Sequence, residues 1–62
     1  MIKNQKIHDR IVELEKAYKG DGDALDEIAR AKETIEYYEN IGEREKASST
    51  LNNLVAFLHD WY

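Results

Sequence analysis

Two stretches of the sequence carry residue types that could do chemistry, and the first is GDGDALDE at residues 20–27. Its spaced aspartates are typical of a calcium-binding loop, in which carboxylates at alternate positions surround the ion. An EF-hand loop, however, needs a third oxygen ligand where Leu25 stands and a glycine where Asp26 stands. The stretch therefore predicts an acidic turn and no metal site, with Asp21 or Asp23 capping the helix that follows.

The second stretch lies near the C-terminus, where Ser48, Ser49, His59 and Asp60 include the side-chain types of a hydrolase triad. All four fall on one predicted helix, and side chains spread along one helix do not converge on a pocket as nucleophile, base and orienting acid. His8 lies on a different helix with no paired set of ligands nearby. We therefore expect no enzymatic activity, no metal and no cofactor.

The elements that would position a site belong to one short domain, residues 1–62. A chain of this length buries only about 60% of the surface that its unfolded form exposes, so its core is thin. The sequence has no cysteine, which excludes disulfides and leaves self-association as a means of burying more surface. The lack of cysteine also fits a reducing cytoplasm, and the longest apolar run, LVAFL at 54–58, is too short to cross a bilayer. We expect a cytoplasmic protein with no membrane partner.

Charge is unevenly distributed along the chain, whose formal net charge is −4. Residues 1–19 contain five basic and three acidic residues, whereas residues 20–42 contain seven acidic and two basic ones. This pattern predicts two helices that attract each other across a shared surface. The basic residues are interleaved with acidic ones and form no clustered positive patch, so we expect no nucleic-acid partner.

Apolar residues recur three and four positions apart in three segments, the spacing that places side chains on one face of a helix. The three glycines, at positions 20, 22 and 42, fall where this pattern breaks, and the sequence has no proline. The sequence therefore predicts an all-α fold, a small three-helix bundle with helices near residues 3–19, 23–40 and 43–61. Its predicted core is Ile7, Ile11, Leu14, Ile28, Ile35, Leu51, Leu54 and Leu58.

One long helix through Gly42 is the alternative for the second and third segments. At about 100° per residue, however, the apolar stripe of the third segment lies roughly 120° around the axis from that of the second. A continuous helix would not keep one apolar face. We therefore predict a break at residues 40–43, where Asn40 and Gly42 are typical of a helix C-terminus.

The third helix is unusual in this chain because residues 47–59 contain no Lys, Arg, Asp or Glu. Its apolar sector spans about 160°, which is wider than an ordinary surface helix needs. This width predicts a helix that lies centrally between the other two and also faces a second copy of the chain. Ile2 and Val12, off the stripe on the far side of the first helix, agree with a further contact surface. The candidate interface residues are Tyr37, Ile41, Asn52, Asn53, Phe57, Trp61 and Tyr62.

These features leave three hypotheses for function. The first, which the sequence favours, is a small non-enzymatic interaction protein that binds and modulates, for example inhibits, a larger protein and acts as a homodimer or larger oligomer. The second is an oligomer that binds a small planar or anionic ligand, such as a nucleotide, between subunits, where aromatic side chains could stack on it. The third is an inhibitor that mimics DNA with an acidic ridge along the second helix and its continuation. The candidate ridge residues are Glu33, Glu36, Glu39 and Glu43.

Overall fold

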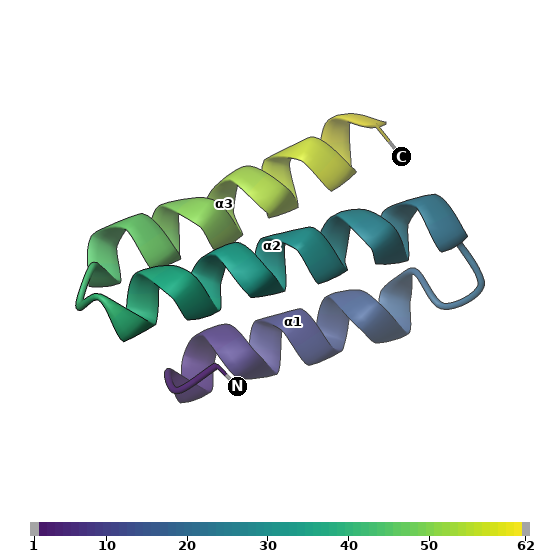
Figure 1. Cartoon of the computed structure of the whole chain (residues 1–62). Helices are drawn as coiled ribbons and strands as arrows, with labels where there is room; N and C mark the ends of the chain where they lie inside the picture. The colour runs from purple at the N-terminus through teal and green to yellow at the C-terminus, as the bar shows by residue number, and fades with distance from the viewer. Residues whose placement is uncertain (1, 62) are drawn as a thin grey trace.

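The computed structural model describes residues 2–61, and the side chains of residues 2–60. Over these residues the chain forms three α-helices, α1 (Gln5–Ala17), α2 (Gly22–Asn40) and α3 (Arg44–Trp61), and no strand. Successive helices run in opposite directions and lie side by side, with α2 between α1 and α3 (Figure 1). The predicted small all-α three-helix fold is therefore confirmed. No helix within the described residues has the length and the apolar character that crossing a membrane would require.

Side-chain caps begin the first two helices. The Asn4 side chain accepts a hydrogen bond from the Ile7 amide at 3.1 Å, and the Asp21 side chain accepts one from the Ala24 amide at 3.2 Å. Of the two cap candidates in the acidic turn, Asp21 is therefore the N-cap of α2. Asp23 lies within the first turn of that helix, where its negative charge interacts favourably with the positive end of the helix dipole.

The turn between α2 and α3 is built around a glycine in the left-handed region. Gly42 has a φ of 80°, which a residue with a Cβ adopts only with strain. The Glu43 amide donates to the Tyr38 carbonyl at 2.8 Å and the Gly42 amide donates to the Glu39 carbonyl at 3.2 Å, the two bonds of a Schellman motif. These bonds satisfy the last carbonyls of α2, and the predicted break between the second and third helices is confirmed.

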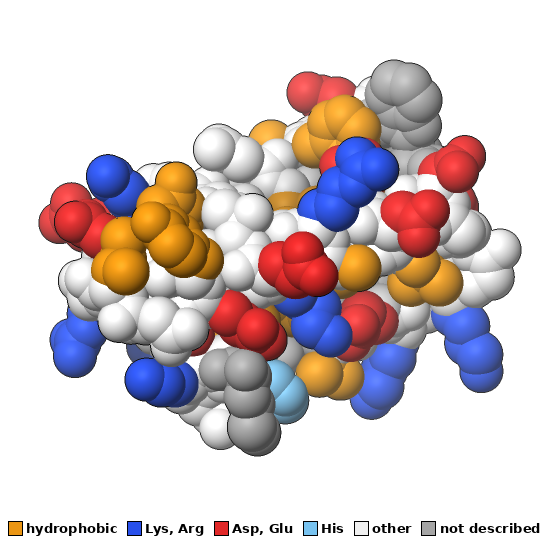
Figure 2. All heavy atoms as spheres, viewed as in Figure 1, with side chains coloured by type: hydrophobic (Ala, Val, Ile, Leu, Met, Phe, Trp, Pro, Cys, Tyr) orange, Lys and Arg blue, Asp and Glu red, His pale blue; other side chains and the backbone are white. Residues whose placement is uncertain are grey.

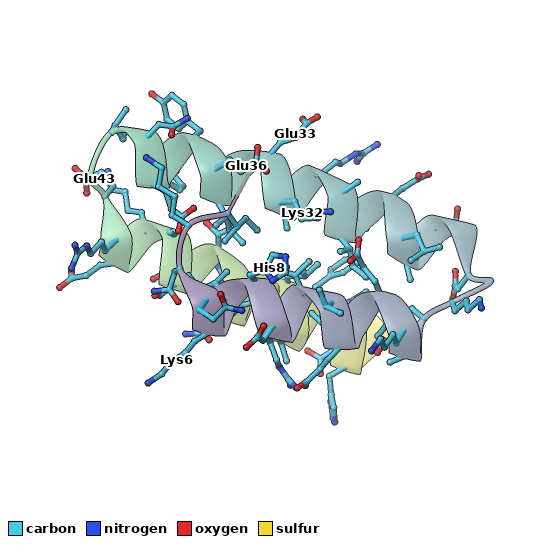
Figure 3. All side chains as sticks on the ribbon, turned by 90° about the horizontal axis from the view of Figure 1, so that it is seen from below. Lys6, His8, Lys32, Glu33, Glu36 and Glu43 are labelled. Atoms are coloured by element: carbon cyan, nitrogen blue, oxygen red, sulfur yellow. The ribbon has the colours of Figure 1, made fainter. Side chains whose placement is uncertain are left out.

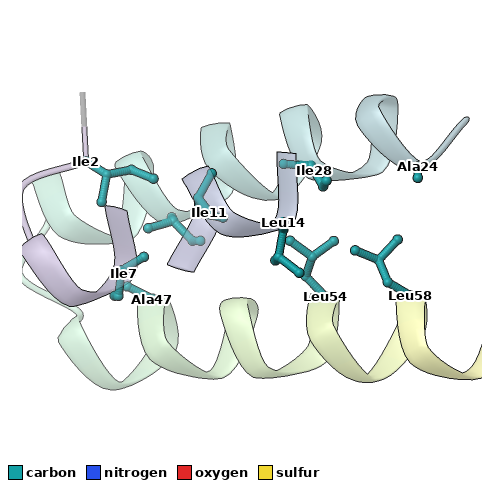
Figure 4. Close-up of a cluster of buried hydrophobic side chains, with 10 residues drawn as sticks. Ile2, Ile7, Ile11, Leu14, Ala24, Ile28, Ala47, Leu54 and Leu58 are labelled. Atoms are coloured by element: carbon teal, nitrogen blue, oxygen red, sulfur yellow. The ribbon is translucent and has the colours of Figure 1, made fainter. Parts of the chain in front are cut away.

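The core is a cluster of aliphatic side chains contributed by all three helices (Figure 4). Its buried members are Ile2, Ile7, Ile11, Leu14, Ala24, Ile28, Ile35, Ala47, Leu54 and Leu58. This set contains every predicted core residue except Leu51, which is half-buried and packs against the edge of the cluster. The prediction for Leu51 is wrong because this residue lies about 40° from the centre of the stripe that the buried α3 residues form, so only part of its side chain reaches the core.

The predicted position of Ile2 is also wrong. Helical spacing places it on the far side of the first helix, but α1 begins only at Gln5 and the residues before it are not helical. The two carboxylate oxygens of Glu39 accept hydrogen bonds from the backbone amides of Lys3, at 2.8 Å, and Asn4, at 2.9 Å. This contact holds the N-terminal segment against α2, and Ile2 is only 6% exposed as a result.

The central helix of the bundle is α2, which packs closely against α3 and more loosely against α1. Ala24 and Ala31 on α2 and Ala47 on α3 belong to the core or pack against it, and their short side chains let the two backbones approach. The buried side chains of α1 are all isoleucine or leucine, which hold its backbone farther from α2. The prediction that the third helix lies centrally is therefore wrong, because α3 has one close neighbour and α2 has two.

The attraction between α1 and α2 also differs from its prediction. Lys32 Nζ on α2 lies 3.3 Å from a carboxylate oxygen of Glu15 on α1, so the base comes from the acidic segment and the acid from the basic one. Both side chains are 39% exposed, and ion pairs of this kind contribute only about 0–1 kcal/mol. Burial of apolar side chains, and not the charge asymmetry of the two segments, therefore provides most of the stability of this contact.

Truncation of Leu54 to alanine is expected to lower the free energy of unfolding by about 2–5 kcal/mol, because it leaves a cavity in a thin core. The Leu54 side chain is 6% exposed, whereas Leu51 on the same helix is half-buried. Leu51→Ala is therefore the matched control, with an expected loss below about 2 kcal/mol. Urea denaturation followed by circular dichroism measures both losses. Equal losses for the two variants would contradict this description of the core.

Candidate functional site

The large hydrophobic side chains that the fold leaves exposed, among the described residues, lie on one outer face of α2 and α3. Tyr37 is 60% exposed, Ile41 53% and Phe57 42%. Figure 2 shows hydrophobic groups towards the two ends of the region over α2 and α3, with uncharged side chains between them. All three residues are candidates from the sequence, and the fold places them on the same surface.

Each helix contributes a second stripe of residues to this surface, separate from its core stripe. Both stripes have the spacing four, three, four, which keeps their members on one side of the helix. We refer to the two stripes, together with Glu27, as the α2–α3 face. Its members are Glu27, Arg30, Thr34 and Tyr37 of α2, the C-cap residue Ile41, and Lys46, Thr50, Asn53 and Phe57 of α3.

A shallow groove of about 230 Å³ runs between the two helices along this face. Its lining includes Ala31 and Leu54, which belong to the edge of the core, and the more exposed Asn53 and Phe57. The groove is lined by the short side chains of Ala31, Thr34 and Thr50, and also by the ion pair between Glu27 and Arg30. It offers a second helix or loop a place to pack closely against both helices.

The threonines of the groove have their hydroxyl donors satisfied within their own helices. Thr34 Oγ1 donates to the Arg30 carbonyl at 3.1 Å, and Thr50 Oγ1 donates to the Lys46 carbonyl at 2.8 Å. Removing a polar group from water is unfavourable mainly when its hydrogen bonds are lost. The centre of the α2–α3 face can therefore be covered by another molecule at a smaller desolvation cost than its composition suggests.

One end of the face is aromatic. The rings of Tyr37 and Tyr38 are 5.6 Å apart at their centroids and inclined by 59°, an arrangement typical of favourable aromatic pairs. Lys46 Nζ lies 5.9 Å from the centroid of the Tyr38 ring, at the limit of a cation–π contact. These contacts restrain Tyr38 at the edge of the core while Tyr37 stays exposed.

The structure does not bring the other candidate interface residues to this face. Asn52 is exposed, but at about 100° per residue it lies on the opposite flank of α3 from Thr50 and Phe57. Trp61 ends α3 with a side chain outside the described part of the structure, and Tyr62 lies wholly outside the described residues. Asn53 is therefore the candidate asparagine that the fold places beside the exposed hydrophobic residues.

The four candidate acidic residues point in different directions. Glu33 is exposed and projects outwards from α2, while Glu36 lines a groove between α1 and α2 together with Lys32 (Figure 3). Glu39 is turned towards the start of α1, where its carboxylate accepts two backbone amides. Glu43 lies in the turn at the tip of the molecule (Figure 3). Of the four residues, Glu39 is therefore occupied by the start of α1, while Glu33 and Glu43 stay exposed.

The two histidines lie beside aspartates that adjoin them in the sequence. Nδ1 of His8 is 3.7 Å from Asp9, and Nδ1 of His59 is 3.9 Å from Asp60. The side chains of the second pair are 88% and 89% exposed, which is unlike the enclosed setting in which a base is oriented for catalysis. No group of three or more His, Asp or Glu side chains within residues 2–60 is placed to hold a metal ion.

A larger hollow of about 530 Å³ lies where the N-terminal segment meets the turn between α2 and α3. Its lining includes the cations Lys3 and Arg44, and the start of two helices lies at this end of the bundle. Glu39 belongs to the same lining, with its carboxylate hydrogen-bonded to the backbone of residues 3 and 4. The positive end of α1 is thus already neutralised by a residue of the chain itself.

The chain matches no protein-family model, no curated protein and no solved structure. The function of the α2–α3 face must therefore be argued from its geometry. Sequence reasoning missed Thr34 and Thr50, because it looked for large apolar residues off the core stripe. The repeated spacing of four, three, four in a second stripe on both helices is the signal that could have identified them.

Replacement of Glu39 by alanine is expected to lower the free energy of unfolding by about 1–3 kcal/mol, since it removes the acceptor of two backbone amides. Glu33→Ala is the matched control because Glu33 is an exposed carboxylate on the same helix, and its expected effect is within about 0.5 kcal/mol of zero. Chemical denaturation gives both values. Amide hydrogen exchange should also be faster at Lys3 and Asn4 in Glu39→Ala, and unchanged exchange there would contradict the role of Glu39.

Proposed function

We propose that this protein is a small non-enzymatic interaction protein that binds and modulates a larger protein and works as a homo-oligomer. The α2–α3 face is its contact surface. The observation that carries the proposal is that the exposed large hydrophobic residues of the described chain lie towards the two ends of one face, Tyr37 and Ile41 at one end and Phe57 in the groove at the other. Aromatic and aliphatic anchors with a polar rim are the usual anatomy of a protein contact surface.

The unequal packing of the three helices also supports a further contact. The contact between α2 and α3 is close, whereas α1 packs more loosely. Such a bundle leaves apolar surface that a second molecule can cover.

Replacement of Phe57 by glutamate is expected to shift the protein to a monomer, because the contact loses an apolar anchor and a carboxylate must be removed from water. Phe57 is 42% exposed in the single chain, so the bundle itself should stay folded. Sedimentation velocity at micromolar concentration measures the assembly, and circular dichroism verifies the helix content. Asn52→Glu, which adds the same charge on the opposite flank of α3, should leave the assembly as it is in the wild type. A wild type that sediments as a monomer of 7.3 kDa would refute self-association.

The larger partner is tested by affinity capture from an extract of the cells that naturally produce the protein. Immobilised wild type and Asn52→Glu should retain the same partner, and Phe57→Glu should lose it, because only the last variant charges the α2–α3 face. Mass spectrometry of the three eluates identifies such a protein. Identical eluates from all three baits would count against the α2–α3 face as the contact surface.

A further inference from the structure

We infer that the α2–α3 face binds one amphipathic α-helix of the larger protein, and that this helix carries basic residues beside its apolar stripe. The inference rests on the partner binding in the proposed function and adds the chemistry of the segment that the face receives. The bound helix lies along the seam between α2 and α3 as a fourth helix of the bundle. The contact between α1 and α2 stays as it is.

The shape of the face fits a helix that spans its two ends. The groove is lined in part by the short side chains of Thr34 and Thr50, and short side chains let another helix approach closely. Phe57 lines the groove together with Arg30, and Ile41 lies eleven residues beyond Arg30 on α2, which is about 16 Å. A helix that contacts both ends therefore needs at least about three turns.

The middle of the face can be covered by an apolar stripe. The hydroxyl groups of Thr34 and Thr50 already donate to carbonyls of their own helices, so covering them leaves neither donor unpaired. The anchors lie at the two ends, where Tyr37, Ile41 and Phe57 are exposed. A partner helix with apolar residues three and four positions apart can contact both ends with one stripe.

The basic residues of the face have contacts within the chain. Nη1 of Arg30 lies 3.4 Å from a carboxylate oxygen of Glu27, so this pair is balanced within the groove. Nζ of Lys46 lies 5.9 Å from the centroid of the Tyr38 ring. The charge that a partner meets is therefore decided mainly by the residues that border the face.

The border of the face is acidic. We count every charged residue on the face, on the flanks of α2 and α3 that turn outwards beside it, and in the turn that joins these helices. The acidic residues are Asp23, Asp26, Glu27, Glu33, Glu43, Glu45 and Asp60, and the basic residues are Arg30, Arg44 and Lys46. This excess of four acidic residues equals the whole net charge of the chain, −4. Acidic groups accordingly lie among the hydrophobic groups in Figure 2, and the segment that this border attracts is basic.

The acidic border is stronger on the side of α2. Asp26 and Glu33 are exposed and lie seven residues apart, about two turns, on the flank of α2 that faces away from α3. Residues 47–59 of α3, by contrast, contain no Lys, Arg, Asp or Glu. The basic residues of the bound helix therefore lie over α2, and its small or uncharged residues lie over α3.

The partner helix and a second copy of the chain compete for this face. A second copy brings the same acidic border with it, so the two borders repel each other, whereas a basic helix neutralises the border. The helix is therefore the stronger ligand. Its binding separates the homo-oligomer into single chains, each with one bound helix.

Synthetic peptides test the chemistry of the bound segment, and two-dimensional NMR of the amide groups of the full chain locates the binding. Three peptides of about 18 residues, or five helical turns, are compared. The first has an apolar stripe flanked by lysine, the second has the same stripe flanked by glutamate, and the third has the residues of the first in an order without a stripe. Only the first should bind, and it should shift the amide signals of Thr34, Tyr37, Thr50 and Asn53 and leave those of α1 in place. Equal binding of the second peptide would overturn the charge of the partner, and equal binding of the third would overturn the helical stripe.

Charge reversal at the border tests which residues attract the helix. The double variant Asp26→Lys/Glu33→Lys should bind the first peptide about tenfold more weakly in Kd, because two attractive charges become repulsive. The matched control is Asp9→Lys/Glu13→Lys, which makes the same change in net charge at exposed positions of α1, away from the face, where salt screens its effect. Fluorescence anisotropy measures Kd, and circular dichroism verifies that each variant is folded. Equal weakening by the two double variants would overturn the α2–α3 face as the binding site.

The results distinguish this inference from the proposed function. A wild type that is monomeric and still binds the first peptide on the α2–α3 face would refute self-association and support this inference. A wild-type oligomer whose face takes none of the peptides would leave the proposed function standing and overturn this inference. If protein concentration alone shifts the amide signals of the face and the first peptide does not, a second copy is the occupant and the basic helix is not. An oligomer that keeps its size in sedimentation while the peptide is bound would overturn the competition.

Discussion

Close packing of α2 against α3 is the contact on which the rest of this bundle depends. Ala24 and Ile35 of α2 are completely buried, and Ile28 is 1% exposed. Burial of each such isoleucine contributes about 1.5–3 kcal/mol, a large share of the stability available to a domain of this size. The helix α1 adds its aliphatic side chains to a core that α2 and α3 already define. The helix that packs against both neighbours is α2, closely against α3 and more loosely against α1.

Short side chains also shape the outer surface of the α2–α3 pair. Where alanine and threonine line the seam, the outer surface is hollowed into a groove, and larger residues stand at its ends. The hydroxyl donors in the groove are satisfied by the helix backbone. The groove also holds the Glu27–Arg30 pair, so its lining combines short uncharged side chains with one ion pair.

The charged residues serve mainly to complete the fold and to keep the remaining surface hydrated. Glu39 neutralises the start of α1 and positions the segment that buries Ile2, and Asp21 caps α2. Lys32 and Glu15 form a partly exposed pair across the contact between α1 and α2. Other acidic residues, such as Glu33 and Glu43, stay exposed.

Features that depend on neighbours in the sequence could be predicted, because helical periodicity, caps and glycine turns are local. The three helices, the turn at Gly42 and all but one of the predicted core residues follow from such local rules, and so does the choice of Tyr37, Ile41 and Phe57 as exposed apolar residues. Features that depend on how helices meet were decided by the tertiary structure. The central place of α2 depends on contacts between different helices. The Glu39 contact that buries Ile2 and the Lys32–Glu15 pair each join residues at least 17 positions apart. The sequence of one helix shows which of its faces is apolar. The distance and rotation between two helices, however, depend on the sizes of the side chains on both. For that reason the α2–α3 face, with Thr34 opposite Thr50, became visible only when the two helices were brought together.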